Sequence, residues 1–91
     1  MRAIERTTKF KRDYKREKRT DPELDAAFVP VIELLATDAE LPERLRDHGL
    51  SGNWAGYRDC HVRPDLVLIY AKPDEATLSL VRIGSHSELF S

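Results

Sequence analysis

The N-terminal part of the chain combines one short alternating segment with one segment of helical spacing. Residues 2–6 alternate weakly between polar and apolar side chains, which predicts a short strand. In the basic segment that follows, from about Lys9 to Arg19, Phe10 and Tyr14 fall one helical turn apart. This spacing predicts a helix, and the preceding threonines supply its N-cap.

A second helix is predicted directly after the first. Asp21-Pro22 is a start signal, since an aspartate can cap the helix and proline is accepted at the first helical position. Pro30 removes one helical hydrogen bond and is expected to kink this helix. Because both helices have an apolar side, they predict an antiparallel helical hairpin. The apolar stripe of the second helix consists of Leu24, Phe28, Val31, Ile32 and Leu35.

The C-terminal half reads as a long connection followed by strands. Between about residues 37 and 53 the periodicity disappears, and connections of this length are often functional. Alternation and turn residues then predict three strands, and the chain ends in one helical turn. The predicted fold is a single α+β domain over residues 1–91, a small antiparallel sheet with the helical hairpin on one face, in β-α-α-β-β-β order. The strands are expected at residues 57–63, 66–72 and about 78–84.

Composition excludes several classes of protein. The 91 residues are 41% hydrophobic and 34% charged, which suits a globular domain with one core. No apolar run reaches the roughly 18–20 residues that span a membrane, and the N-terminus lacks the apolar region of a signal peptide. The single cysteine, Cys60, cannot form an internal disulfide. We therefore expect a cytoplasmic protein without a membrane partner.

The net charge of −1 conceals a strong asymmetry. Residues 1–20 carry a net charge of +6 and the other 71 residues carry −7. A basic face on one helix is typical of a surface that binds phosphate groups, although a solvated helix with internal ion pairs would show the same composition. The candidate substrate-binding residues on this helix are Lys9, Lys11, Arg12 and Lys15.

Polar side chains line one face of the strand predicted at residues 57–63. Successive side chains of a strand point to opposite faces, so Tyr57, Asp59, His61 and Arg63 share one face, and Arg58, Cys60 and Val62 share the other. A tight turn at Pro64-Asp65 would place Cys60 and Val62 beside Ile69 and Val67. That face is expected to contact the helices, which leaves the polar set on the open face of the sheet.

The last strand adds a second polar pair. Arg82 and His86 lie on either side of Gly84, two residues away in each direction, so both side chains are expected on one face. The third histidine, His48, lies in the long connection. Imidazoles titrate near neutral pH, and two of them with a cation can move protons around a phosphodiester and stabilise its developing charge.

Two other site chemistries compete with this interpretation. Three histidines and an aspartate could bind a metal, but no pair has ligand spacing and the neighbouring arginines would repel a cation. Nucleophilic catalysis by Cys60 is disfavoured, because its side chain should point toward the helices.

Two segments of the chain carry a family resemblance. "RDHGLSGNWAGYRDCHVRPDLVLIY" and the terminal "RIGSHSELF" closely resemble the YafQ branch of the RelE/ParE toxin superfamily. They cover roughly half of the chain. The resemblance implies an mRNA interferase, the toxin of a type II toxin–antitoxin pair. Such toxins cut mRNA in the ribosomal A site without a metal or cofactor: the ribose 2′-hydroxyl attacks the adjacent phosphate and leaves a 2′,3′-cyclic phosphate.

By motif, the resemblance implies a catalytic set of His48, His61, Asp65 and His86. Asp59, Arg82 and Phe90 would bind substrate or shape the site. We expect His86 to act as general acid and either His61 or Asp65 as general base, while Arg82 and His48 stabilise the phosphorane-like charge. The chain departs from the branch at Leu66, where relatives often have a tryptophan that could stack on a base.

The resemblance also implies partners and leaves alternatives. A toxin of this kind is held by an antitoxin, here a DinJ-like DNA-binding dimer in a heterotetramer, and acts on ribosome and mRNA. A ParE-like inhibitor of gyrase would need no catalytic histidines. A binding module that uses only the basic helix would produce no cut ends. A degenerate toxin kept for partner binding is the remaining alternative.

Overall fold

A five-stranded mixed sheet lies at the centre of the part of the chain, residues 1–90, that the computed structural model describes. The strand order is β1-β5-β4-β3-β2. The edge strand β1 runs parallel to β5, and every other neighbouring pair is antiparallel. The strands are β1 (Ala3–Arg6), β2 (His48–Gly49), β3 (Arg58–Arg63), β4 (Leu66–Ala71) and β5 (Thr77–Gly84).

The predicted α+β fold with a helical hairpin is confirmed, but two details of the sheet differ. The sheet is mixed rather than wholly antiparallel, because β1 pairs with β5 and runs in the same direction. Alternation specifies that a segment is a strand but not the direction of its neighbour. The short β2 lies inside the segment that was expected to be only a connection, between two short 3-10 turns at Glu43–Leu45 and Gly52–Trp54.

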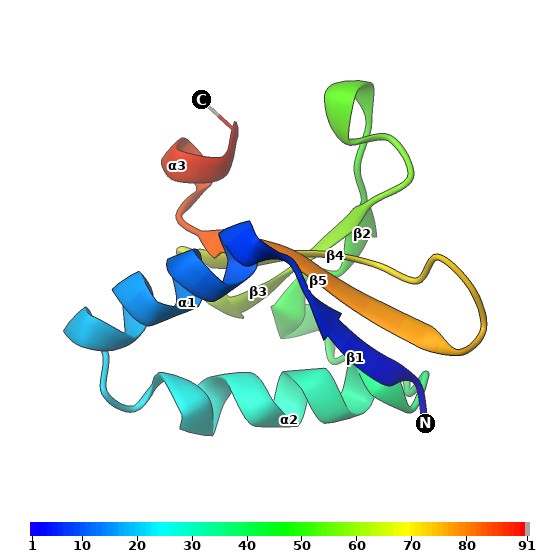
Figure 1. Cartoon of the computed structure of the whole chain (residues 1–91), viewed down its shortest axis with the longest axis horizontal. Helices are drawn as coiled ribbons and strands as arrows, with labels where there is room; N and C mark the ends of the chain where they lie inside the picture. Colours follow the sequence, from blue (N-terminus) through cyan, green and yellow to red (C-terminus); the bar gives the residue numbers. More distant parts are fainter. Residues whose placement is uncertain (91) are drawn as a thin grey trace.

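The two long helices begin and end close to the predicted positions. In α1 (Thr8–Thr20), the N-cap Thr7 accepts a hydrogen bond from the Phe10 backbone amide at 2.9 Å. The α2 helix (Leu24–Ala36) continues through Pro30 to its end (Figure 1). Aromatic rings from α1 contact Phe28 of α2, with the nearest ring centroids 4.8 Å apart. This contact closes the helical hairpin.

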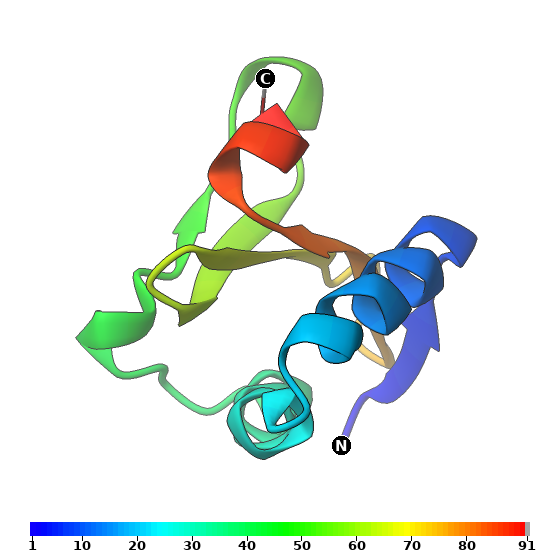
Figure 2. The same ribbon diagram turned by 90° about the vertical axis from the view of Figure 1, so that its left-hand side faces the viewer.

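The main core lies between this hairpin and one face of the sheet. Figure 2 shows α2 on one side of the sheet and α3 (His86–Phe90) on the other. On the hairpin side, buried residues of both helices meet side chains from β3, β4 and β5. Those from the strands are Cys60, Val62, Leu66, Leu68, Tyr70, Leu78, Leu80 and Ile83.

A bulge in β3 decides which residues join this core. The pairing of β3 with β4 shifts between His61 and Arg63, so Cys60 lies opposite Leu68. Regular pairing across the two-residue turn would instead place Cys60 opposite Ile69. One extra residue on a strand moves the register by one, and a shift of one residue exchanges the two faces of the partner strand.

The prediction that Val67 and Ile69 face the helices is therefore wrong. Both are fully buried, but in a second, smaller cluster on the opposite face of the sheet. Leu89 of α3 covers them, together with residues of the turn that follows β2. Here Trp54 packs edge-on against Tyr57, with ring centroids 5.4 Å apart. The polar face of the sheet is thus only partly open.

Helices long and apolar enough to cross a membrane are absent from residues 1–90.

Candidate functional site

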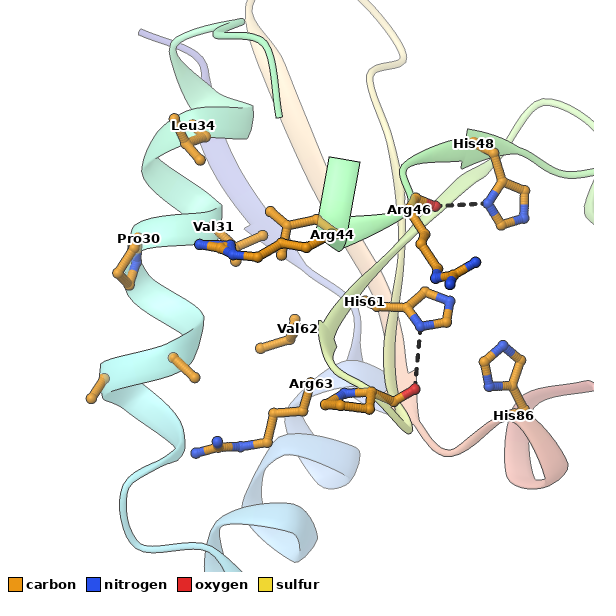
Figure 3. A pocket seen from close by; sticks show the side chains of 14 residues that line it. Pro30, Val31, Leu34, Arg44, Arg46, His48, His61, Val62, Arg63 and His86 are labelled. Atoms are coloured by element: carbon orange, nitrogen blue, oxygen red, sulfur yellow. Dashed lines mark hydrogen bonds between the residues drawn. The ribbon is translucent and has the colours of Figure 1, made fainter. Parts of the chain in front are cut away.

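Three histidines from three separate elements line one surface pocket (Figure 3). His48 lies on β2, His61 on β3, and His86 begins α3. The pocket has a volume of about 1060 Å³ and extends from these rings toward α2. The three histidines are up to about 40 positions apart in the sequence, and the fold brings them together at the open part of the sheet. This is where the sequence predicted their imidazoles.

His61 and His86 form the closest pair in this group. Their ring centroids are 4.9 Å apart and the rings are inclined by 56°. His61 Nδ1 lies 3.3 Å from the backbone oxygen of Pro64. His86 Nδ1 lies 3.4 Å from Asp65 Oδ1, which the His86 backbone amide also approaches at 3.4 Å. The turn between β3 and β4 thus orients both rings.

His48 has the same arrangement on the other side of the pocket. Its Nδ1 lies 2.8 Å from the backbone oxygen of Arg46. Each of the three rings therefore places Nδ1 beside an oxygen that only accepts hydrogen bonds. In the neutral rings this assigns the proton to Nδ1 and leaves the lone pair on Nε2, the atom available to a substrate. The arrangement can accept or donate protons at three points.

Asp59 lies buried beneath the histidines rather than beside a substrate. The residue is 2% exposed, and its Oδ1 is 3.1 Å from His48 Nδ1. That oxygen has no hydrogen-bond partner in residues 1–90. Burial raises the pKa of this carboxyl, and the three nearby histidines oppose the rise. Asp59 is thus a buried carboxyl beneath the imidazoles, where a bound molecule in the pocket cannot reach it directly.

The buried Asp59 predicts a pH-dependent stability difference. Because its pKa is raised on folding, the ionised carboxylate destabilises the fold above the folded-state pKa, and this effect disappears below the unfolded value of about 3.9. We expect Asp59→Asn to be more stable than the wild type at pH 8 but not at pH 3.5. Urea unfolding at both values measures the difference. A less stable variant at pH 8 would show that attraction to the histidines exceeds the effect of burial.

The C-terminal turn that carries His86 is fixed by its own cap. Ser85 and Glu88 form reciprocal hydrogen bonds, from the Ser85 amide to Glu88 Oε1 at 3.0 Å and from the Glu88 amide to Ser85 Oγ at 3.3 Å. Glu88 also pairs with Arg16 of α1 at 3.1 Å. Phe90 is partly exposed, and its ring centroid lies 6.0 Å from that of His86. Phe90 therefore lies at the edge of the histidine site.

Arg82 lies against α1 and does not line the histidine pocket. Its Nε donates to Asp13 Oδ2 at 2.7 Å and its Nη2 to Asp13 Oδ1 at 3.0 Å. Asp13 is 3% exposed and also accepts the Ile83 backbone amide at 3.2 Å. The carboxylate raises the pKa of Arg82. Arg82 lies opposite Ile69, on the face of the second cluster, but Asp13 holds its guanidinium away from the histidine pocket.

Two further predicted placements change with the bulge in β3. Arg63 was expected on the face of His61, but its Nε pairs with Asp21 at 2.7 Å, on the side of the helices (Figure 3). Leu66 is 7% exposed and belongs to the main core. The side chain of residue 66 is therefore not available in this protein for stacking on a base.

The candidate basic residues of α1 are all on the surface. The exposed side chains are those of Lys9, Lys11, Arg12 and Lys15. They are not part of the histidine pocket, but the Arg16–Glu88 ion pair joins their helix to α3. The basic face and the turn that carries His86 are therefore neighbouring surfaces.

The sequence reasoning missed the residues that anchor His48. Asp47 accepts hydrogen bonds from the Tyr70 hydroxyl and from Arg58 Nη2, the latter at 3.1 Å. Burial and this bond raise the pKa of Tyr70. Asp47 thus fastens the connection to the sheet, immediately before His48. The only signal in the sequence was its position next to a histidine in an otherwise irregular segment.

Metal binding and nucleophilic catalysis by Cys60 are the two competing chemistries. Within residues 1–90, no group of three or more His, Cys, Asp or Glu side chains is arranged to hold a metal ion. Cys60 is fully buried in the main core, and burial raises the pKa of its thiol to about 12. A protonated, inaccessible thiol cannot act as a nucleophile.

Comparison with known proteins identifies the family. The family described as "Bacterial toxin of type II toxin-antitoxin system, YafQ" matches residues 2–91. The chain belongs to the YafQ toxin family. It is 35% identical to the mRNA interferase toxin YafQ of Escherichia coli K12 over 90 residues, which are 99% of this chain and 97% of that protein. The resemblance seen in the sequence is confirmed.

Solved structures of related toxins share this fold. The toxin in the E. coli DinJ–YafQ complex is 34% identical, with a TM-score of 0.87 and complete coverage of both chains. A metal-bound toxin from Helicobacter pylori is 43% identical, with a TM-score of 0.90 over 99% of this chain and all of the other. The mixed sheet and helical hairpin described above are therefore the YafQ fold.

Proposed function

We propose that this YafQ toxin is an endoribonuclease that cuts mRNA in the A site of the ribosome. Family membership and the mRNA interferase relatives support the substrate class. The observation that carries the proposal is the pair of rings His61 and His86, 4.9 Å apart, with each Nδ1 beside an oxygen and each Nε2 left for substrate. Two imidazoles at this spacing can serve the two oxygens of one phosphodiester.

In the proposed reaction, His61 is the general base and His86 the general acid. His61 Nε2 removes the proton of the 2′-hydroxyl, and the 2′-oxygen forms a bond to the adjacent phosphorus. The bond from phosphorus to the 5′-oxygen then breaks, and protonated His86 gives its Nε2 proton to that leaving oxygen. The products are a 2′,3′-cyclic phosphate and a 5′-hydroxyl.

The other site residues support these two. Asp65 orients His86, because its Oδ1 lies 3.4 Å from Nδ1 of that ring. His48 stabilises charge on the phosphorane, and the buried Asp59 lies beneath it, with Oδ1 3.1 Å from His48 Nδ1. Phe90 offers an aromatic face next to His86 on which a base can stack.

We propose two macromolecular contacts in addition to the mRNA. The basic face of α1 binds ribosomal RNA through phosphate groups, because its four exposed cations lack a role in the core. A DinJ-like antitoxin, a DNA-binding dimer in a heterotetramer, holds the toxin inactive; the E. coli DinJ–YafQ complex supports this partner. The site of action is then the cytoplasm.

The chemistry of the cut ends tests the proposed function. We expect programmed ribosomes incubated with the purified toxin to yield 2′,3′-cyclic phosphate ends. EDTA should not change this yield, provided that Mg²⁺ is kept in excess over the chelator so that the ribosomes stay intact. The reason is that the proposed reaction uses proton transfer by histidines and no metal bound to the toxin. A linear 3′-phosphate or 3′-hydroxyl as the first product would contradict this mechanism. An intact mRNA with inhibited gyrase would support the ParE-like alternative.

A further inference from the structure

Arg46 is one of three arginines that line the pocket, and the proposed mechanism does not yet use the charge of any of them. Its exposed side chain runs into the space between the rings of His48, His61 and His86 (Figure 3). No carboxylate in residues 1–90 lies within ion-pair distance of its guanidinium. An unpaired guanidinium among three proton-transfer groups is placed to meet an anion.

The other arginines near the pocket are differently placed. Arg63 is paired with Asp21 and points toward the helices, and Arg44 lies toward α2 (Figure 3). Arg82, which was expected to stabilise the phosphate, is held by two hydrogen bonds to Asp13. The geometry therefore leaves Arg46 as the cation that faces the histidines.

The backbone of Arg46 has an unusual conformation that serves the same site. Its φ of 49° lies in the left-handed region, which few residues other than glycine adopt and which is often found at functional sites. In this conformation its carbonyl oxygen accepts from His48 Nδ1 at 2.8 Å. One residue thus orients an imidazole with its backbone and presents a cation with its side chain.

We propose that Arg46 binds the scissile phosphate and stabilises the charge that develops on it during cleavage. This inference rests on the proposed endoribonuclease function. As the 2′-oxygen attacks, negative charge accumulates on the two non-bridging oxygens of the phosphate. A guanidinium offers two parallel donors to such a pair of oxygens. Its contribution should therefore be larger in the transition state than in the bound substrate.

Three variants separate the charge of Arg46 from its backbone role. Arg46→Asn removes the charge, and asparagine tolerates the left-handed conformation. Arg46→Lys retains the charge without the paired donors. Arg44→Asn removes a neighbouring exposed cation and is the matched control. In single-turnover cleavage of ribosome-bound mRNA at saturating toxin, we expect a loss of about 10²-fold for Arg46→Asn, partial recovery for Arg46→Lys, and little change for the control.

Equal cleavage by Arg46→Asn and Arg44→Asn would overturn the proposal. Equal losses in Arg46→Asn and Arg46→Lys would support the contact through the paired donors of the guanidinium. If the wild type itself does not cleave, the proposed function fails instead. Binding to ribosomes whose A-site codon carries 2′-deoxynucleotides then decides the role of Arg46: several-fold weaker binding of Arg46→Asn than of Arg44→Asn supports a phosphate contact, and equal binding overturns it.

Discussion

Replacing His86 by alanine should reduce mRNA cleavage by about 10²–10⁴-fold, the usual contribution of one general acid. The imidazole projects from the first residue of α3 into the pocket, where it lies beside His61, Asp65 and Phe90. The variant removes the proton donor to the leaving 5′-oxygen. Because the His86 side chain is exposed, its removal leaves no cavity in either hydrophobic core. We therefore expect a folded protein that still binds its antitoxin but does not cut.

Ser87→Ala is the matched control for this variant, because Ser87 is the exposed neighbour in the same turn. Cleavage is measured in a single-turnover ribosome assay, and folding by circular dichroism and co-purification with the antitoxin. Wild-type cleavage by His86→Ala would remove His86 from the mechanism. Loss of cleavage together with loss of antitoxin binding would indicate a structural role instead. Normal activity of Ser87→Ala shows that the turn itself tolerates substitution.

Replacing Asp13 by alanine should destabilise the protein by about 3 kcal/mol, the range found when one partner of a buried ion pair is removed. Asp13 is 3% exposed and accepts three hydrogen bonds, two from Arg82 and one from the Ile83 amide. Without the carboxylate, Arg82 loses its partner, and the buried amide loses its acceptor. The change therefore loosens the packing of α1 on the second half of β5.

Asp25→Ala is the comparison for Asp13→Ala. Asp25 also has two polar partners, Lys18 and Tyr14, but it is an exposed aspartate. Exposed pairs contribute little, so its loss should change the unfolding free energy far less. Urea unfolding followed by circular dichroism gives both values. If both variants lose a similar, small amount of unfolding free energy, Arg82 and the Ile83 amide form hydrogen bonds with water in place of Asp13. Asp13 would then not be needed to hold α1.

Much of the fold followed from local patterns in the sequence. Helical spacing gave α1 and α2 to within about three residues, and turn residues gave β3, β4 and β5. The three histidines were selected as a group before their positions were known, because all three lie outside apolar stripes. These inferences depend on the local chain, where periodicity, caps and turns carry the information.

The remaining features depend on contacts between distant segments. The parallel pairing of β1 with β5 joins the two ends of the chain, and no local pattern specifies strand direction. The placement of Arg82 depends on Asp13, 69 residues earlier. Arg46 appeared in the sequence as one charge in an irregular segment, and only the fold brings it to the histidines. Such pairings become visible only when the chain is assembled.

The bulge in β3 has a consequence for how the chain can vary. One additional residue between His61 and Arg63 sets the register, so that Cys60 meets Leu68 and the faces of β4 are fixed. If the same residues paired without the bulge, Cys60 would lie opposite Ile69, so that Val67 and Ile69 would turn to the helices and Leu66, Leu68 and Tyr70 would cover the site. Over many generations, the number of residues in this strand should accordingly change less readily than the identity of its apolar residues. Insertions and deletions are expected to accumulate elsewhere, in the connections that leave the register unchanged.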